Sequence, residues 1–134
     1  MVVNHGLKIM EGAELADKER YQRLVGKLIY LSHTRPDIAY AVGVVSHFMH
    51  QPHTDHMEAV WRIIRYLKGT SGHVVLFKAH GHLEIKGYTD ANWVGNLVDR
   101  RSTSGYFTLV GGNLVTWKSK KQKVVALSSA EAEF

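Results

Sequence analysis

Cysteine is absent from the 134-residue chain, and proline occurs only twice. The lack of cysteine excludes disulfide bonds and thiolate zinc sites, and it gives no support to a secreted protein. No apolar run approaches the roughly 18 residues that a membrane-spanning helix needs. The first residues also lack the basic and apolar regions of a signal peptide. We therefore expect a cytoplasmic or nuclear protein, not a secreted one, with no membrane partner.

The chain has more basic than acidic residues. Lysine and arginine number 17 against 12 acidic residues, which gives a formal net charge of +5, while 45% of the residues are hydrophobic, as in an ordinary globular protein. A basic surface attracts anionic partners, and nucleic acid is the leading candidate. A basic surface that only contacts solvent is the alternative, and charge alone leaves both open.

Hydrophobic spacing divides the chain into a helical zone at 17–70 and a zone of strands and turns at 71–134, after a poorly defined segment at 1–16. Three predicted helices with short links between them indicate a small helical bundle or platform. The second zone opens with HVVLFKA and shows the alternation typical of strands. The sequence therefore predicts an α+β fold in which helices precede an antiparallel sheet.

Each predicted helix has a start signal in the sequence. Asp17 is a good N-cap, Pro36 suits a first turn, and Asp55 with Glu58 resembles a capping box. Gly69 is expected to end the third helix. Apolar residues at helical spacing predict the buried faces: Leu24, Leu28 and Leu31 in the first helix, Ile38, Ala41, Val42, Val45 and Met49 in the second, and Met57, Trp61, Ile64 and Leu67 in the third.

The strand zone contains a clear hairpin signal. The segment 105–119 reads as two strands joined around Gly111 and Gly112, and LEIKGYTDANW before it reads as another strand. The segment KVVAL extends the last strand in one interpretation. Ser128 and Glu131 then form an S-x-x-E capping box, which predicts the first turn of a further helix.

Two acidic residues are candidates for chemistry. Asp90 is predicted at or near the end of a strand, where an acid can face a groove or a metal ion; the alternative is an ordinary turn aspartate. Glu133 follows the predicted cap at Ser128 and, unlike Glu131, has no visible local role. It could face a neighbouring strand, or it could be a solvated helix glutamate.

Two basic clusters flank the segments that carry these acids. They are Arg100 with Arg101, and Lys118, Lys120, Lys121 and Lys123. Cations near a carboxylate site suit a polyphosphate backbone. Lysines on a hairpin edge also discourage aggregation, and a nuclear-localisation-like patch is a further alternative.

Histidine recurs every three residues at His47, His50, His53 and His56, which suggests a zinc site by ligand type. The spacing places these residues across a helix end, a proline and a helix start, so four converging ligands would require a tight corner. No second-shell partner is visible in the sequence. We therefore do not expect a metal site there.

Several long motifs, in order, resemble the Pol polyprotein of copia-type LTR retrotransposons, most closely plant ones. The resemblance covers nearly everything after Asp17, and it is carried by YQRLVGKLIYLSHTRPDIAYAVGVVSHFM, AVWRIIRYLKGT and GYTDANWVGNLVDRRSTSGYFTLVGGNLVTWKSKKQKVVALSSAEAEF. It implies that 17–70 is the thumb or connection segment that follows the reverse transcriptase active site. It also implies that 71–134 is the N-terminal half of a ribonuclease H domain, with a three-stranded antiparallel sheet.

The resemblance further implies which residues carry chemistry. Ribonuclease H holds two divalent ions, Mg²⁺ or Mn²⁺, in a cluster of carboxylates. By motif position Asp90 is the first acid and Glu133 the second, while the remaining acids belong to later segments of the family. Asn92 stands where many relatives have Asp, and Phe134 replaces a frequent Tyr. We therefore expect an incomplete site that binds metal weakly and is inactive alone.

The implied partner is an RNA–DNA hybrid, and two other interpretations remain open. One is a non-catalytic nucleic-acid-binding module, with Trp93 or Trp117 as a stacking surface. The other is a co-opted interaction protein that binds a partner, or a second copy of itself, through an exposed sheet edge.

Overall fold

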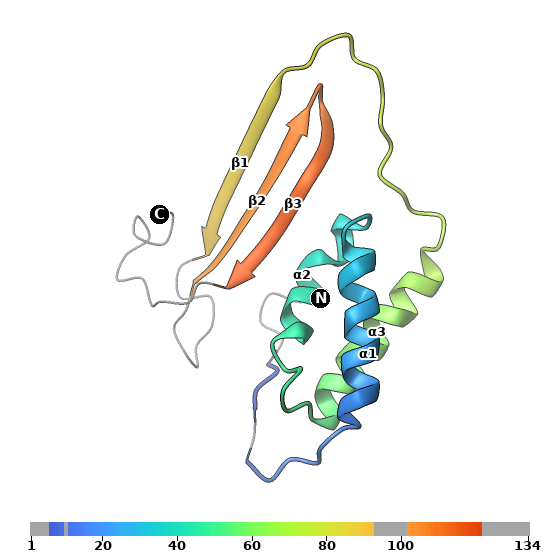
Figure 1. Cartoon of the computed structure of the whole chain (residues 1–134), viewed down its shortest axis with the longest axis vertical. Coiled ribbons are helices and arrows are strands. Elements are labelled where there is room, and N and C mark those ends of the chain that lie inside the picture. Colours follow the sequence, from blue (N-terminus) through green and yellow to red (C-terminus); the bar gives the residue numbers. More distant parts are fainter. Residues whose placement is uncertain (1–5, 10, 93–101, 122–134) are drawn as a thin grey trace. The chain divides into compact units, whose positions relative to one another are not determined.

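A computed structural model describes residues 6–9, 11–92 and 102–121. The chain divides into two compact units, Met1–Val74 and Val75–Phe134, which are treated separately below. The first contains three helices and the second a three-stranded open sheet (Figure 1). Their bounds are α1 Lys18–Ser32, α2 Pro36–Ser46, α3 Thr54–Gly69, β1 Ile85–Asn92, β2 Thr103–Val110 and β3 Asn113–Lys121. The predicted α+β class is confirmed.

The helix boundaries follow local signals in most places. The carboxylate of Asp17 accepts a hydrogen bond from the backbone N–H of Arg20 at 3.0 Å, so it caps α1 as predicted. Pro36 is the first residue of α2, where a missing N–H costs nothing. Gly69 is the last residue of α3.

The start of α3 differs from the sequence prediction. His53, not Asp55, is the N-cap. The ring of His56 is fully buried, and its Nδ1 accepts from the backbone N–H of His53 at 2.9 Å. Its Nε2 lies 3.0 Å from the carbonyl oxygen of Lys8 and therefore donates to it. Burial lowers the pKa of His56. Both ring nitrogens are thus engaged in hydrogen bonds, Nδ1 at the helix start and Nε2 to Lys8, and neither keeps a lone pair for a metal ion.

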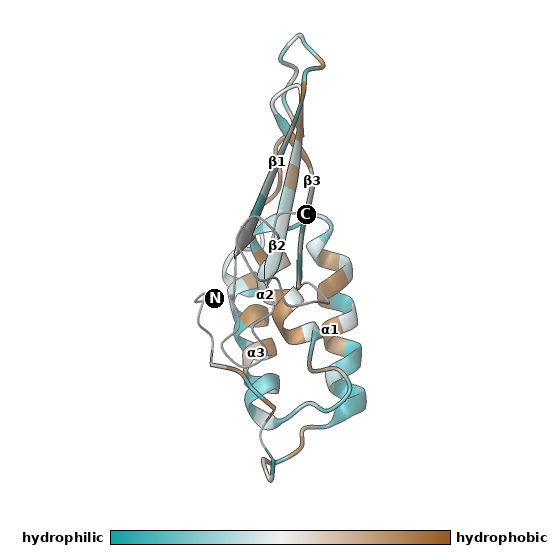
Figure 2. Cartoon of the chain, turned by 90° about the vertical axis from the view of Figure 1, so that its left-hand side faces the viewer, coloured by the Kyte–Doolittle hydropathy of each residue, from teal (hydrophilic) through white to brown (hydrophobic). Residues whose placement is uncertain are grey.

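One face of each helix contributes to a single apolar core, and Figure 2 shows the apolar residues of the helices in brown. Leu28 in α1 and Ile38, Val42 and Val45 in α2 are buried as predicted. In α1 and α3 the buried faces are centred on other residues than the sequence predicts. The residues of this core cluster are Tyr21, Val25, Leu28, Ile38, Val42, Val45, Ala59, Val60 and Ile63. Leu24, Ile64 and Leu67 are only partly buried, and Leu31 is exposed.

Tyr21 explains the shift in α1. Its ring is fully buried, and its hydroxyl donates to the carbonyl oxygen of Val45 at 2.6 Å, which satisfies the polar end of the side chain inside the core. Burial raises the pKa of this phenol above its ordinary value. The contact ties α1 to the end of α2.

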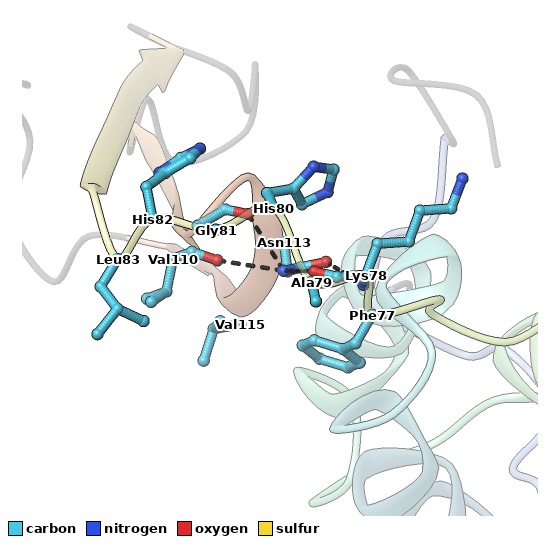
Figure 3. Close-up of a pocket in the computed structure, with 11 residues that line it drawn as sticks. Phe77, Lys78, Ala79, His80, Gly81, His82, Leu83, Val110, Asn113 and Val115 are labelled. Carbon is cyan, nitrogen blue, oxygen red and sulfur yellow. Dashed lines mark hydrogen bonds between the residues drawn. The ribbon is translucent and has the colours of Figure 1, made fainter.

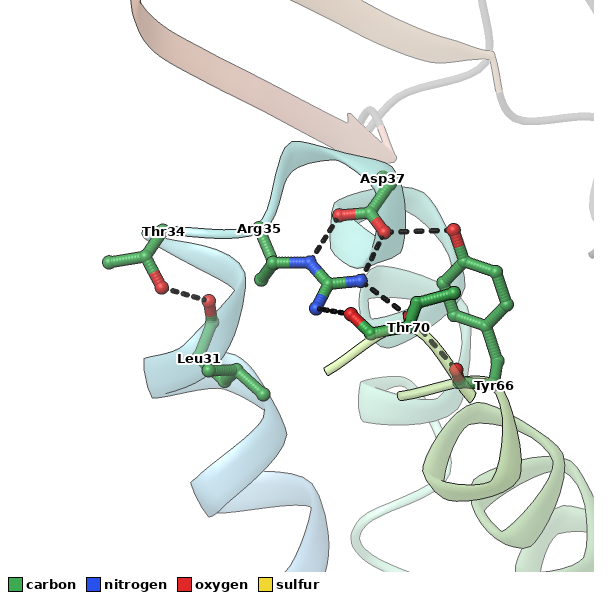
Figure 4. A network of polar contacts seen from close by, with 6 residues as sticks. All are labelled: Leu31, Thr34, Arg35, Asp37, Tyr66 and Thr70. Atoms are coloured by element: carbon green, nitrogen blue, oxygen red, sulfur yellow. Dashed lines mark hydrogen bonds and ion pairs between the residues drawn. The ribbon is translucent and has the colours of Figure 1, made fainter. Parts of the chain in front are cut away.

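A buried arginine closes the other end of the helical unit (Figure 4). Arg35, only 8% exposed, donates from Nε and Nη2 to the two carboxylate oxygens of Asp37 at 2.9 and 2.7 Å. Its Nη1 donates to the carbonyl oxygen of Thr70 at 3.0 Å. The Tyr66 hydroxyl also donates to Asp37 at 2.9 Å. The Arg35 guanidinium, with help from Tyr66, lowers the pKa of Asp37 to about 2.

The sheet has the strand order β1-β2-β3, with both pairs antiparallel. Gly111 and Gly112 form the turn between β2 and β3 with φ values of 53° and 76°. Positive φ at both central residues is the requirement of a type I′ turn, which glycine meets without strain. The predicted hairpin is confirmed. The segment HVVLFKA, by contrast, forms neither helix nor strand.

A β-bulge interrupts the hairpin shortly after the turn. Leu109 pairs with Leu114, but Thr108 pairs with Thr116, so Val115 is an extra residue on β3. Because side chains alternate along a strand, one extra residue moves every later side chain of β3 to the opposite face of the sheet.

The register gives the sheet two different faces. On the aromatic face, Tyr88, Phe107 and Trp117 form one cross-strand row, and the first two rings stack with centroids 4.7 Å apart. On the lysine face, Tyr106 and Lys118 form the neighbouring row. None of the described residues after Val74 is a buried hydrophobic residue, and Tyr88 and Phe107 remain 46% and 40% exposed.

Candidate functional site

Asp90 lies near the end of β1, as the sequence predicts, and its side chain is exposed. It pairs with Gly105 on β2, which in turn pairs with Ser119 on β3. Residues that are directly opposite in antiparallel strands share a face. Asp90 and Ser119 therefore lie on the aromatic face, one row beyond Tyr88, Phe107 and Trp117.

Gly105 leaves the centre of this row without a side chain. A Cβ atom added there would have one neighbour within 4 Å, the backbone oxygen of Lys118 at 3.7 Å. A glycine inside a strand often marks a place where a ligand or another backbone approaches closely. The surface between Asp90 and Ser119 is therefore open beside the carboxylate.

The donor atoms in this row are oxygens, which hard cations such as Mg²⁺ prefer. One carboxylate and one hydroxyl do not complete the near-octahedral oxygen shell that Mg²⁺ requires. Over 6–9, 11–92 and 102–121, no three His, Asp, Glu or Cys side chains come together as a metal site. Asp90 fits the role of one ligand, and Glu133 lies outside the described residues.

The basic candidates are only partly described. Lys118 and Lys120 are exposed on β3, and the backbone of Lys121 pairs with Thr103. Arg100, Arg101 and Lys123 lie outside the described residues, as does the predicted helix start at Ser128 and Glu131.

The register separates Lys118 and Lys120 from Asp90. Lys118 pairs with Tyr106 and Lys120 with Ser104, so both belong to the lysine face, whereas Asp90 belongs to the aromatic face. The two lysines therefore do not line the surface beside Asp90. The sheet therefore presents Asp90 on one face and Lys118 and Lys120 on the other.

Tyr106 is a residue of the lysine face that sequence reasoning missed. It is 47% exposed on the central strand and stands directly across from Lys118. The signal that could have revealed it is the alternation along β2, where Tyr106 and Phe107 must point to opposite faces.

A hollow of about 440 Å³ lies at the hairpin end of the sheet (Figure 3). Asn113 holds one wall in place, since its side chain accepts from the N–H of Lys78 at 2.7 Å and donates to the carbonyl of Lys78 at 2.8 Å. The turn pairs with the start of β1, about 17 Å along the strand from Asp90. This hollow is therefore separate from the carboxylate row.

Several known proteins are similar to the chain over most of its length. The chain is 45% identical over 128 residues to the retrovirus-related Pol polyprotein from transposon RE1 of Arabidopsis thaliana. It is 48% identical over 118 residues to that from transposon TNT 1-94 of Nicotiana tabacum. It is also 46% identical over 115 residues to secreted RxLR effector protein 161 of Plasmopara viticola. These matches cover 96%, 87% and 85% of the chain.

Two of these relatives are large polyproteins encoded by transposons. The chain is homologous to a segment of the retrovirus-related Pol polyproteins from transposons. It spans 9% of the length of the RE1 and TNT 1-94 polyproteins, but 81% of the effector protein.

No protein-family model matches the chain, and no solved structure matches it. Among the helices that the structure describes, none is long and apolar enough to cross a membrane.

Proposed function

We propose that the chain is the part of a copia-type Pol polyprotein that joins the reverse transcriptase thumb or connection to a ribonuclease H domain. In this role, Asp90 and Glu133 contribute to a site that cuts the RNA of an RNA–DNA hybrid. The supporting observation is the position of Asp90. Its side chain is exposed near the end of β1 in the antiparallel sheet β1-β2-β3, and it lies directly across from Gly105, which has no side chain.

Asp90 and Glu133 would hold Mg²⁺ or Mn²⁺ through carboxylate oxygens. Such ions activate a water molecule and stabilise the leaving oxygen in two-metal hydrolysis. Two carboxylates supply few of the ligands that Mg²⁺ needs, and this ion gives up water reluctantly. We therefore expect weak binding, and no cleavage by the 134-residue chain alone.

The proposed substrate is polyanionic, and the basic residues are its expected contacts. Arg100, Arg101, Lys121 and Lys123 would bind its phosphates, which position a nucleic acid without reading its sequence. Lys118 and Lys120 lie on the face of the sheet opposite Asp90, so they do not belong to this contact. Such a partner is found in the cytoplasm or the nucleus, which is the compartment that we propose for the chain.

Mn²⁺ binding tests the role of Asp90. Titration of Mn²⁺ into the isotopically labelled chain should broaden the backbone NMR signals of Asp90, Gly105 and Ser119 first, because a bound paramagnetic ion would lie beside their row. Asp90→Asn should abolish this broadening. Glu84→Gln removes another exposed carboxylate of the same unit and should leave it unchanged. Broadening that survives in Asp90→Asn would refute the assignment.

A hybrid-cleavage assay tests the expected inactivity. An end-labelled RNA–DNA hybrid incubated with the 134-residue chain in Mg²⁺ or Mn²⁺ should remain intact. Cleavage that disappears in Asp90→Asn would show that the chain carries an active site without further residues.

The effector relative supports a second candidate function. In that secreted protein the matched region makes up most of the chain, so a similar sequence also occurs as a short protein. A short protein of this kind could act by binding, and β1 and β3 are the edge strands of the described sheet. Self-association through an edge predicts a molar mass in light scattering that rises toward a dimer with concentration. A constant monomer mass would count against it.

A further inference from the structure

The lysine face combines an exposed aromatic ring with two cations. Its central row contains Thr89, Tyr106 and Lys118, and Ser104 and Lys120 belong to the next row toward the end of β3. Tyr106, Lys118 and Lys120 are all exposed. Of the described strand positions on this face, none is acidic. The face therefore attracts anions, and it carries an exposed ring on which a base can stack.

We propose that the lysine face binds single-stranded nucleic acid, with an unpaired base stacked on Tyr106 and the backbone phosphates on Lys118 and Lys120. This inference rests on the part of the proposed function that makes nucleic acid the partner. It does not depend on metal binding or cleavage at Asp90, which lies on the opposite face.

The geometry suits an unpaired strand. Lys118 stands directly across from Tyr106, at the Cβ separation of about 5 Å that cross-strand neighbours have. Lys120 follows on the same side of β3, about 7 Å further along the strand. A sheet face that carries an exposed aromatic ring beside a row of cations can stack one base on the ring and hold the backbone of the strand on the cations. A base within a duplex keeps its ring faces covered by neighbouring bases, so we expect duplexes to bind less tightly.

Protection of a sheet edge is the competing explanation for the lysines, since β3 is an edge strand of the described sheet. It does not account for Tyr106, which lies on the central strand and leaves 47% of its surface exposed on the same side. Edge protection also predicts a different consequence of removing the lysines, namely self-association without any loss of nucleic-acid affinity.

Fluorescence anisotropy with a labelled oligouridylate tests the proposal directly on the 134-residue chain. Tyr106→Ala should weaken binding roughly 5- to 150-fold, the loss expected for one stacked base, and Tyr106→Phe should restore most of it. Lys118→Gln with Lys120→Gln should reduce the slope of log K against log salt by about 1.4, since each phosphate contact on a single strand contributes about 0.7.

Matched variants on the aromatic face serve as controls. Tyr88→Ala removes a tyrosine of similar exposure, 46%, and Lys86→Gln removes an exposed lysine of β1. Both should leave the affinity and the salt slope within about twofold of the parent chain, while circular dichroism confirms that every variant is folded. Because Tyr106→Phe keeps the ring, it separates a lost stacking contact from a misfolded sheet.

Three results would overturn the proposal. They are unchanged binding in the Tyr106 and lysine variants, an equal loss in the Tyr88 and Lys86 controls, and dimer formation by the lysine variants with binding intact. Asp90→Asn should bind oligouridylate normally. The cleavage hypothesis and the binding hypothesis can therefore fail independently of each other.

Discussion

The helical unit and the described part of the sheet unit differ in how much of their apolar surface they bury. In the helical unit, nine hydrophobic residues from three helices are buried in a common core. In the described part of the sheet unit no hydrophobic residue is buried, and several remain open to solvent, including Leu83 at 84% and Ile85 at 71%. The described strands are joined by backbone pairing and by partly exposed side-chain contacts such as the Tyr88–Phe107 stack, whereas the helices share a buried core.

This difference bears on function as well as stability. A three-stranded sheet needs a packed apolar face to be stable by itself, and the aromatic face is the one that also carries Asp90. Whatever covers Tyr88, Phe107 and Trp117 would also border the carboxylate. The stability of the sheet and the completion of the candidate site are therefore linked through one face.

The largest expected effect comes from removing a core side chain. Ile38, 2% exposed in α2, is matched by Ile85, 71% exposed in β1. Ile38→Ala should lower the free energy of unfolding of the helical unit by about 2–5 kcal/mol, and Ile85→Ala should change stability by about 0.5 kcal/mol or less. Urea denaturation followed by far-UV circular dichroism measures both. Equal effects would remove the contrast between the two units.

A smaller effect is expected at the hairpin turn, where two adjacent glycines can be compared. Both have positive φ, so alanine at either position should cost roughly 1–2 kcal/mol. At Gly111 the added Cβ would also lie 2.6 Å from the backbone oxygen of His82, while at Gly112 its nearest neighbour is the His80 ring at 3.5 Å. Gly111→Ala should therefore be the more damaging change, measured by thermal loss of the strand NMR signals. The opposite order would contradict the described turn.

The smallest effect is expected in acid and only in the helical unit. The pKa of Asp37 is lowered in the folded state from 3.8 to about 2. Its contribution to stability is therefore present above its ordinary pKa and is lost as the pH falls toward 2. Asp37→Asn should be less stable at neutral pH and lose less stability on acidification, as measured by urea midpoints at a series of pH values. Asp55→Asn, an exposed acid outside the Arg35 network, should follow the parent chain.

Features that depend on neighbouring residues could be predicted from the sequence. Asp17 caps a backbone N–H three residues away, and the Gly111–Gly112 turn joins strands that are adjacent in the chain. The strand position of Asp90 also follows from local alternation. These signals suffice for the fold class, because they fix where elements begin and end.

Features that depend on distant partners were missed. Tyr21 is buried because its hydroxyl reaches the carbonyl of Val45, and His56 because its ring reaches that of Lys8. Arginine is mostly exposed in proteins, yet Arg35 is buried and donates to the carbonyl of Thr70. In each case a polar group is satisfied by a residue that lies far away along the chain, and spacing alone contains no such information.

The separation of Asp90 from Lys118 and Lys120 was missed for a different reason. An uninterrupted ladder from the pair Val110 and Asn113 would place Lys118 opposite Gly105, and thus on the face of Asp90. The bulge at Val115 changes that partner to Ser119 and turns Lys118 to the other face. Nothing in the local sequence identifies the bulge, although it decides which residues share a surface.

Hydrogen exchange of the backbone amides, followed by NMR in the 134-residue chain, tests the central contrast most directly. The amides in the middle of α1, α2 and α3 should exchange slowly, since a buried core must open to release them. The amides paired within β1, β2 and β3 should exchange much faster. Equal protection of strands and helices would contradict the account, because it would mean that the sheet is stabilised as strongly as the helical core.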